Sequence, residues 1–194
     1  MRLYILLIVM LSIAIGCKRS SINLEEQAQK VEYFDLVAFV EAEATRLNDA
    51  DYRFRKTVNI NGEEEVQDIA TISIADELAF LKSNNINRPA MVGRYKVDSI
   101  RNEQGQLQSI SHNALDEKLA LQSLVIEFDE AEEIAQIELQ SQTSSRLLKT
   151  FSKATYQPDQ GYQLSNQQRI TFFGEQDMRI ELEYLVGESE RVRK

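Results

Sequence analysis

The chain has little of the side-chain chemistry that most metal and catalytic sites need. Its 194 residues include one cysteine, one histidine, no tryptophan and seven glycines. A lone cysteine forms no disulfide within the chain, so stability must come from packing. One cysteine and one histidine do not make a zinc or copper ligand set, and the glycines form no phosphate-binding loop. We therefore expect no metal and no cofactor.

Catalytic arrangements are scarce as well. Ser111 precedes His112 in "SISHNAL", but no G-x-S-x-G motif is present to form a nucleophile elbow. We expect His112 to be a polar residue near a strand end. Acidic clusters at 63–65 and 129–133 lie in predicted turns, without the ligand spacing of a calcium loop. We expect no catalytic residue. A hydrolase that uses dispersed carboxylates is the enzymatic alternative.

Acidic residues outnumber basic ones, 31 to 22, which gives a net charge of −9. Such a balance disfavours nucleic acid as a partner and repels anionic lipid surfaces. Basic residues are scattered on the predicted strands, without the interleaved aromatic residues of a single-strand binder. Any membrane attachment should therefore come from a covalent lipid and not from a basic face.

One apolar run stands at the start of the sequence. Arg2 is followed by about thirteen nearly all apolar residues and then by small residues ahead of Cys17. This order is typical of a secretory signal, and the run is shorter than the roughly 20 residues of a spanning helix. An ordinary signal peptide with an incidental cysteine and an uncleaved anchor helix are the alternatives.

The stretch Ala14-Ile15-Gly16-Cys17 resembles the lipobox of bacterial lipoproteins, in which Leu is more usual where Ala14 stands. The resemblance implies cleavage between Gly16 and Cys17, a diacylglyceryl group on the Cys17 sulfur and an acylated new amino terminus. Two or three acyl chains hold a protein firmly, whereas one anchors it only marginally. The expected partner is thus the membrane, through the lipid on Cys17.

The composition changes along the chain divide it into four parts. Residues 1–16 are the predicted signal peptide, and 17–32 the lipidated cysteine and a polar, flexible tether. Residues 33–186 form one predicted α+β domain, and 187–194 a frayed tail. The fifteen residues that follow Cys17 reach at most ~50 Å when extended.

Two helices are predicted by apolar residues at helical spacing. In the first, over about 36–48, Asp35 fits the N-cap, and Phe34 and Phe39 fit a hydrophobic staple. The second covers 74–83, with Ser73 as its cap.

Alternating apolar residues predict strands through most of the remaining sequence. "YRFRKTVNI" leads into Asn61-Gly62, a strong hairpin signal, and another turn is expected at 102–106. The pattern also puts Phe172 on one face with Tyr162, Leu164 and Ile170. We predict an α+β, mostly β fold: an antiparallel meander of about nine strands, curved or half-barrel-like, with two short helices.

Such a sheet is too wide for two helices to cover. Nine strands span roughly 43 Å, and each helix is ~10 Å across. The sheet must curl, split into two layers or leave an apolar surface for a partner. We expect the helix at 36–48 to cover this surface, as a permanent plug or as a movable lid. The candidate apolar binding face or core consists of Leu36, Val40, Leu47, Leu124, Ile126, Ile137 and Leu139.

Four segments of the body, "YFDLVAFVEAEATRLN", "NINRPA", "YKVDSI" and "ALDEKL", resemble a group of uncharacterised lipoproteins of Bacteroidota-type bacteria. The resemblance implies an outer-membrane location and no particular activity. The basic and serine residues after Cys17 depart from the surface-display pattern of that group and favour the periplasmic face.

The predicted architecture also resembles, in outline, the half-barrel carriers of lipoprotein transport. We therefore expect a non-catalytic binding or assembly module whose partner is a hydrophobic ligand, an envelope protein or a peptide. The alternative is a purely structural envelope lipoprotein with a closed core and no ligand site.

Overall fold

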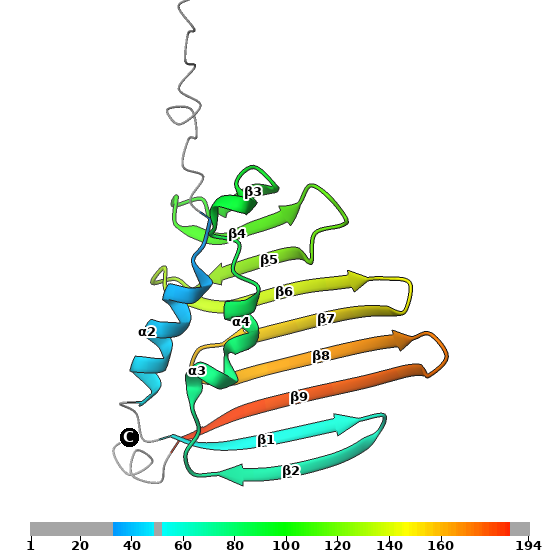
Figure 1. Ribbon diagram of the computed structural model, residues 1–194. Helices are drawn as coiled ribbons and strands as arrows, with labels where there is room; N and C mark the ends of the chain where they lie inside the picture. Colours follow the sequence, from blue (N-terminus) through cyan, green and yellow to red (C-terminus); the bar gives the residue numbers. More distant parts are fainter. Residues whose placement is uncertain (1–32, 49–51, 187–194) are drawn as a thin grey trace, which may run out of the picture. The chain divides into compact units, whose positions relative to one another are not determined.

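Nine antiparallel strands form one open sheet, with short helices packed on one face (Figure 1). The structure is a computed structural model that describes residues 33–48 and 52–186. These residues belong to one compact unit. The predicted signal peptide, Cys17, the tether and the tail lie outside the described residues. The α+β, mostly β fold class is confirmed.

The strands follow the predicted alternation closely. Most are joined by tight turns, and the Asn61-Gly62 turn has positive φ at both residues, 54° and 92°, as a type I′ hairpin requires. The strands are β1 Tyr52–Ile60, β2 Glu63–Ile69, β3 Tyr95–Arg101, β4 Leu107–Ala114, β5 Leu121–Phe128, β6 Ile134–Ser144, β7 Leu148–Gln157, β8 Gly161–Ile170 and β9 Gly174–Val186.

The strand order is β2-β1-β9-β8-β7-β6-β5-β4-β3. Strands β3 to β9 form the predicted meander, and the first hairpin joins its far side by pairing β1 with β9. The sheet does not close, which leaves β2 and β3 as edges. Both edges have charged side chains, among them Glu63–Glu65 on β2 and Lys96 on β3, which discourage pairing with another sheet.

The first predicted helix is confirmed as α2, Leu36–Asn48. Asp35 Oδ1 accepts hydrogen bonds from the amides of Val37 and Ala38 at 3.0 and 3.2 Å. The rings of Phe34 and Phe39 are 5.9 Å apart, as expected for a staple. Local sequence signals thus account for where this helix begins.

The second predicted helix is divided into α3, Ile74–Glu77, and α4, Ala79–Ser83. Ser73 is the N-cap of α3, as expected. Leu78 lies between the two helices at φ −89° and ψ 12°, and its side chain is fully buried. Packing of Leu78 into the core overrides the continuous helical pattern. A 3-10 helix at Pro89–Met91 adds one further turn.

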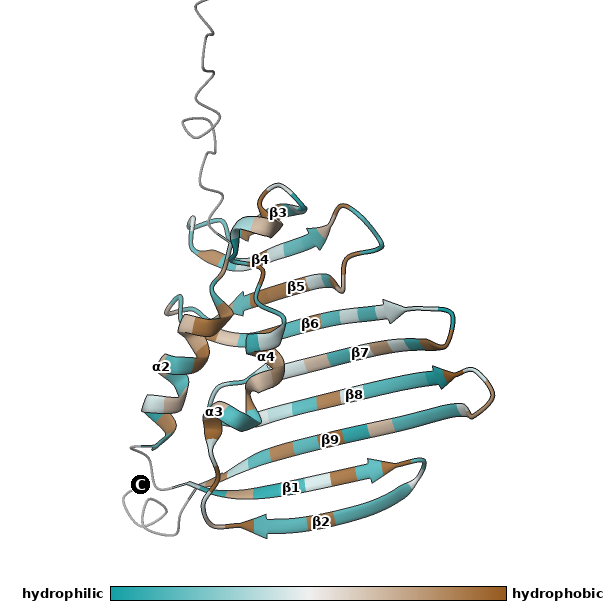
Figure 2. Cartoon of the chain, viewed as in Figure 1, coloured by the Kyte–Doolittle hydropathy of each residue, from teal (hydrophilic) through white to brown (hydrophobic). Residues whose placement is uncertain are grey.

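The core lies between the helices and the inner face of one half of the sheet. Leu36, Val40 and Leu47 point from α2 into this core, and each is at most 2% exposed. Both α2 and β5 carry brown, apolar segments in Figure 2. The same hydrophobic cluster contains Leu124, Ile126, Ile137 and Leu139.

The other half of the sheet extends past the helices. Along β7 and β8, the inner-face pairs change from Ala154–Leu164 to Ser152–Asn166 and Thr150–Gln168. The inner face is therefore polar at these two pairs, and the next pair, Leu148–Ile170, is apolar again. Of the three expected arrangements, a sheet that leaves an apolar surface applies at most to parts of this region, because polar and apolar pairs alternate beyond the helices.

Candidate functional site

Helix α2 is held on the sheet by a polar network. Glu43, 6% exposed, accepts a hydrogen bond from the hydroxyl of Tyr156 on β7 and two from Arg46, at 2.7 and 2.8 Å. Arg46 also pairs with Asp159 in the β7–β8 turn at 2.5 Å. Burial raises the pKa of Tyr156 far above its usual value, so Tyr156 remains a proton donor to Glu43.

A second network fixes α3. Lys56 Nζ on β1 lies 2.9 Å from Glu77 Oε1, and the Tyr162 hydroxyl donates to Glu77 Oε2 at 2.7 Å. Burial, followed by the hydrogen bond to Glu77, raises the pKa of Tyr162. Glu43, Glu77 and Lys56 thus have partners at the helix–sheet boundary, which favours a permanent cover, while the buried Tyr184 hydroxyl has none among the described residues.

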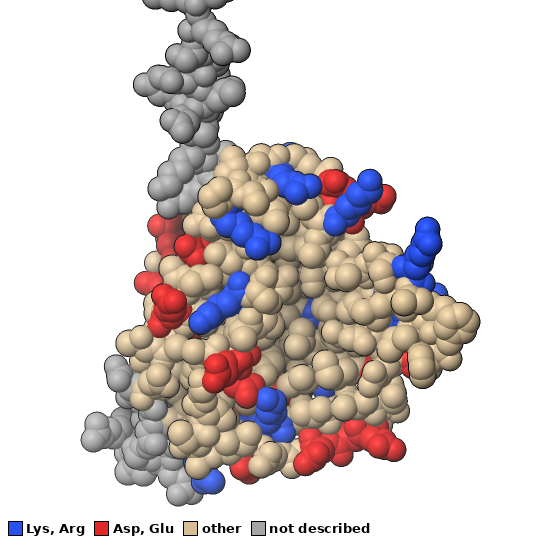
Figure 3. All heavy atoms as spheres, in the orientation of Figure 1, with Lys and Arg blue, Asp and Glu red and all other residues tan. Residues whose placement is uncertain are grey.

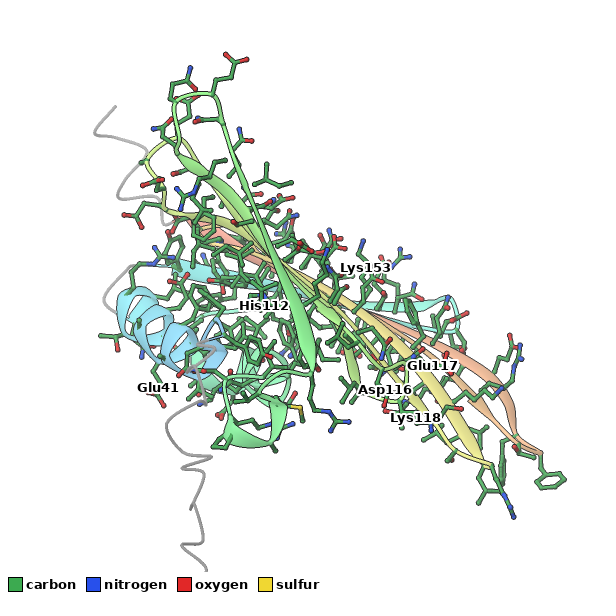
Figure 4. All side chains as sticks on the ribbon, turned by 90° about the horizontal axis from the view of Figure 1, so that it is seen from above. Glu41, His112, Asp116, Glu117, Lys118 and Lys153 are labelled. Atoms are coloured by element: carbon green, nitrogen blue, oxygen red, sulfur yellow. The ribbon has the colours of Figure 1, made fainter. Side chains whose placement is uncertain are left out.

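The seven residues predicted as a binding face or core belong to the core, because of their burial. All seven are buried in one cluster, three on α2 and four on β5 and β6, so they form the core. Open hollows of ≈ 450, 530 and 600 Å³ lie instead on the outer face of the sheet, among polar side chains such as Gln136, Gln163, Gln167 and Arg179. Figure 4 shows Lys153 on that outer face.

His112 lies near the end of β4, two residues before Ala114, as expected, and its side chain is buried. It lies on the inner face of β4 at 2% exposure, and its ring is 5.8 Å from that of Tyr33 (Figure 4). Burial lowers the pKa of His112 below its usual range, and its Nδ1 has no hydrogen-bond partner among the described residues. A neutral histidine packed in a core has no access to substrate.

Two more properties of residues 33–48 and 52–186 bear on function. Their His, Cys, Asp and Glu side chains form no group of three or more that could hold a metal ion. No helix within these ranges has both the length and the apolar content to cross a membrane.

The sheet end away from the helices has the most unusual surface. Ile60 pairs with Met178, whereas β8 and β9 remain paired as far as Ile170 and Gly174. The β8–β9 hairpin thus extends four residues, about 14 Å, beyond the end of β1. On the other side, β5 pairing reaches Ser141, three residues or about 10 Å before the end of β6.

The β6–β7 and β8–β9 hairpins therefore protrude side by side (Figure 1). We call residues 144–149 and 169–175 the double-hairpin tip. Phe172, Phe173 and Leu147 are at its end, 94%, 87% and 63% exposed. The two phenylalanines are the most exposed large apolar side chains among the described residues, and their turn is brown between teal strand ends in Figure 2.

Hydrogen bonds join the two turns of the tip. The amide of Thr171 donates to the Leu147 carbonyl at 2.9 Å, and the Thr171 hydroxyl donates to the Arg146 carbonyl at 3.1 Å. Ser145 Oγ accepts from the amides of Leu147 and Leu148 at 3.3 and 3.0 Å. These bonds fix the two turns to each other, so the tip is ordered and its three apolar side chains lie at the same end of the sheet.

Phe172 occupies an unfavourable conformation for its residue type. Its φ is 75°, in the left-handed region where glycine and asparagine are favoured and a bulky aromatic residue is rare. The expectation that Phe172 shares one face with Tyr162, Leu164 and Ile170 is wrong, because the chain turns at 171–173. The sequence signal that could have located this turn is the pair Phe172-Phe173 directly before Gly174. An aromatic residue kept at a costly position supports a functional hypothesis.

Comparisons with known proteins add no family to this description. A scan against protein-family models found no match, and a search of curated proteins found none.

Proposed function

We propose that this chain is a bacterial envelope lipoprotein, anchored by lipid on Cys17 in the outer membrane and facing the periplasm. We further propose that its domain is a non-catalytic binding or assembly module for a lipid, lipoprotein or peptide partner. The lipobox-like Ala14-Ile15-Gly16-Cys17 supports the anchor. The protruding tip with three exposed apolar side chains supports the binding role.

The tip is the observation on which the binding role depends. Large apolar side chains concentrated on a protrusion mark an interaction site more often than singly scattered ones do. A structural envelope lipoprotein without a ligand site is the second candidate, because the helix-covered half of the sheet has a closed core. The two candidates differ in whether the tip has a partner.

Photocross-linking in cells separates the two candidates. A photoreactive residue at Phe173 of the full-length protein should give adducts with an envelope component. The matched control places the same residue at Ala131, an exposed position in the β5–β6 turn at the helix-covered end. Adducts at position 173 alone are the expected result. Equal yields at both positions, or none at either, would favour the structural candidate.

A further inference from the structure

The charge of the double-hairpin tip differs from that of the whole chain. Residues 144–149 and 169–175 include Arg146, Lys149 and Arg169 but a single acidic residue, Glu175, in a chain of net charge −9. Arg169 pairs with Glu175, whereas no ion pair of Arg146 or Lys149 occurs within the described part of the chain. Basic side chains project beside the β6–β7 turn in Figure 3.

Acidic residues outside the tip lie farther back along the sheet. Asp177 lines a hollow with Lys149 and Arg169, and Glu117 lines another with Ser144. The cluster Glu63–Glu65 is on β2, two strands away from β9, and its hairpin ends about 14 Å short of the β8–β9 turn. Figure 3 shows acidic side chains along the β1–β2 hairpin, below the tip. The Debye length is about 8 Å at physiological ionic strength, so Glu63–Glu65 contribute little to the electrostatic potential at the end of the tip, where Arg146 and Lys149 lie.

We propose that the double-hairpin tip inserts Leu147, Phe172 and Phe173 into the interface of an anionic phospholipid bilayer. This inference rests on the proposed function and identifies its partner as lipid. Interfacial binding increases with buried apolar area and with attraction to anionic headgroups, and the tip provides both. Overall charge predicts repulsion from such a surface, but the tip is a local exception.

The hydrogen bonding of the tip backbone also suits an apolar environment such as a bilayer interface. Unpaired amides and carbonyls are costly in a bilayer, so inserted turns need partners within the protein. The amides of Ser145 and Phe173 bond to the carbonyls of Leu148 and Ile170 at 2.8 and 3.1 Å. Together with the bonds from Thr171 and to Ser145 Oγ, they satisfy the amides of Ser145, Leu147, Leu148, Thr171 and Phe173 internally.

Depth-dependent quenching tests the proposal in the lipidated full-length protein. Because Cys17 is the only cysteine, Phe173→Cys provides a second thiol for a fluorescent dye, and Ala131→Cys is the matched control. The protein is reconstituted in phosphatidylcholine vesicles with or without phosphatidylglycerol, with brominated acyl chains as the quencher. We expect at least about twofold stronger quenching at position 173 than at 131, and only with phosphatidylglycerol.

The tip cations provide a second variant that leaves the apolar residues in place. Arg146→Glu with Lys149→Glu should reduce quenching at position 173 to the level of position 131, because charge attraction is lost. Equal exposure of positions 173 and 131 to aqueous iodide, with no lipid quenching, would overturn the proposal. So would protein adducts at position 173 without lipid quenching.

Dye stoichiometry reports separately on the anchor. One dye per chain is expected in the Ala131→Cys protein, because lipid occupies Cys17. Two dyes per chain would contradict the proposed anchor, while quenching at position 173 would still decide whether the tip inserts.

Discussion

Glu43 of α2 and Tyr156 of β7 are joined by a hydrogen bond across the helix–sheet boundary, where both side chains are buried. Opening α2 would strip Glu43 of this bond and expose the apolar stripe beneath it. Opening would therefore lose a buried hydrogen bond and the burial of large apolar side chains at the same time. The relationship therefore favours a permanent plug over a movable lid.

The plug interpretation predicts the effect of Val40→Asp. Val40 is fully buried, so the variant places an unpaired charge in the core and should destabilise the domain by several kcal/mol. Ala42→Asp, on the exposed side of α2, is the control and should change stability little. Denaturation midpoints and apolar dye binding distinguish the outcomes. A folded Val40→Asp variant that binds dye would indicate a movable lid.

The buried histidine predicts a pH dependence. Because burial lowers the pKa of His112, the unfolded chain binds a proton near pH 6.5 that the folded chain does not. Stability should therefore fall as pH drops below about 6.5, by at most ~1.4 kcal/mol per unit. In the His112→Gln variant, the free energy of unfolding should change less between about pH 5 and 7 than it does in the original protein. Parallel losses in both proteins would show that His112 is not the cause.

Replacement of either of two glycines with positive φ should destabilise the domain, but by very different amounts. Gly62 has φ 92° and no atoms within 4 Å of an added Cβ, so Gly62→Val should cost about 1 kcal/mol or more through backbone strain. At Gly161, with φ 122°, an added Cβ would overlap the Leu182 carbonyl oxygen, so Gly161→Ala should cost several kcal/mol. Melting temperatures of the two variants test this order. An unchanged value for Gly62→Val would contradict the tight turn.

Features with local causes were predictable from the sequence. Helix 36–48 was found because Asp35 and the Phe34–Phe39 staple mark its start. Strand β1 and its turn follow from alternation and from Asn61-Gly62. The candidate core was also predicted, since apolar periodicity reports which side chains face inward.

Features set by distant contacts were not predictable in the same way. Pairing of β1 with β9 joins residues more than a hundred positions apart, and nothing local specifies it. Burial of Leu78 divides the second helix, and burial of His112 depends on Tyr33 packing over it. The tip was missed because alternation alone does not show where a long hairpin ends, so Phe172 was assigned to a face.

The anchor prediction concerns Cys17. Cys17→Ser should prevent incorporation of radiolabelled acyl chains and leave unprocessed precursor, because the sulfur that accepts the lipid is missing. Ser20→Ala, three residues later, should leave labelling unchanged. Electrophoresis of labelled cells provides both readouts. Normal acyl incorporation in the Cys17→Ser variant would contradict the lipoprotein assignment.

The central claim is that the helix-covered half of the sheet provides stability and the double-hairpin tip provides binding. The most direct measurement combines Phe172→Ser and Phe173→Ser in the full-length protein, with a photoreactive residue at Leu147. Both phenylalanines are exposed, so the denaturation midpoint should shift by no more than about 0.5 kcal/mol in free energy, while adducts from position 147 are lost. Undiminished adducts, or a loss of stability comparable to that of Val40→Asp, would contradict this division.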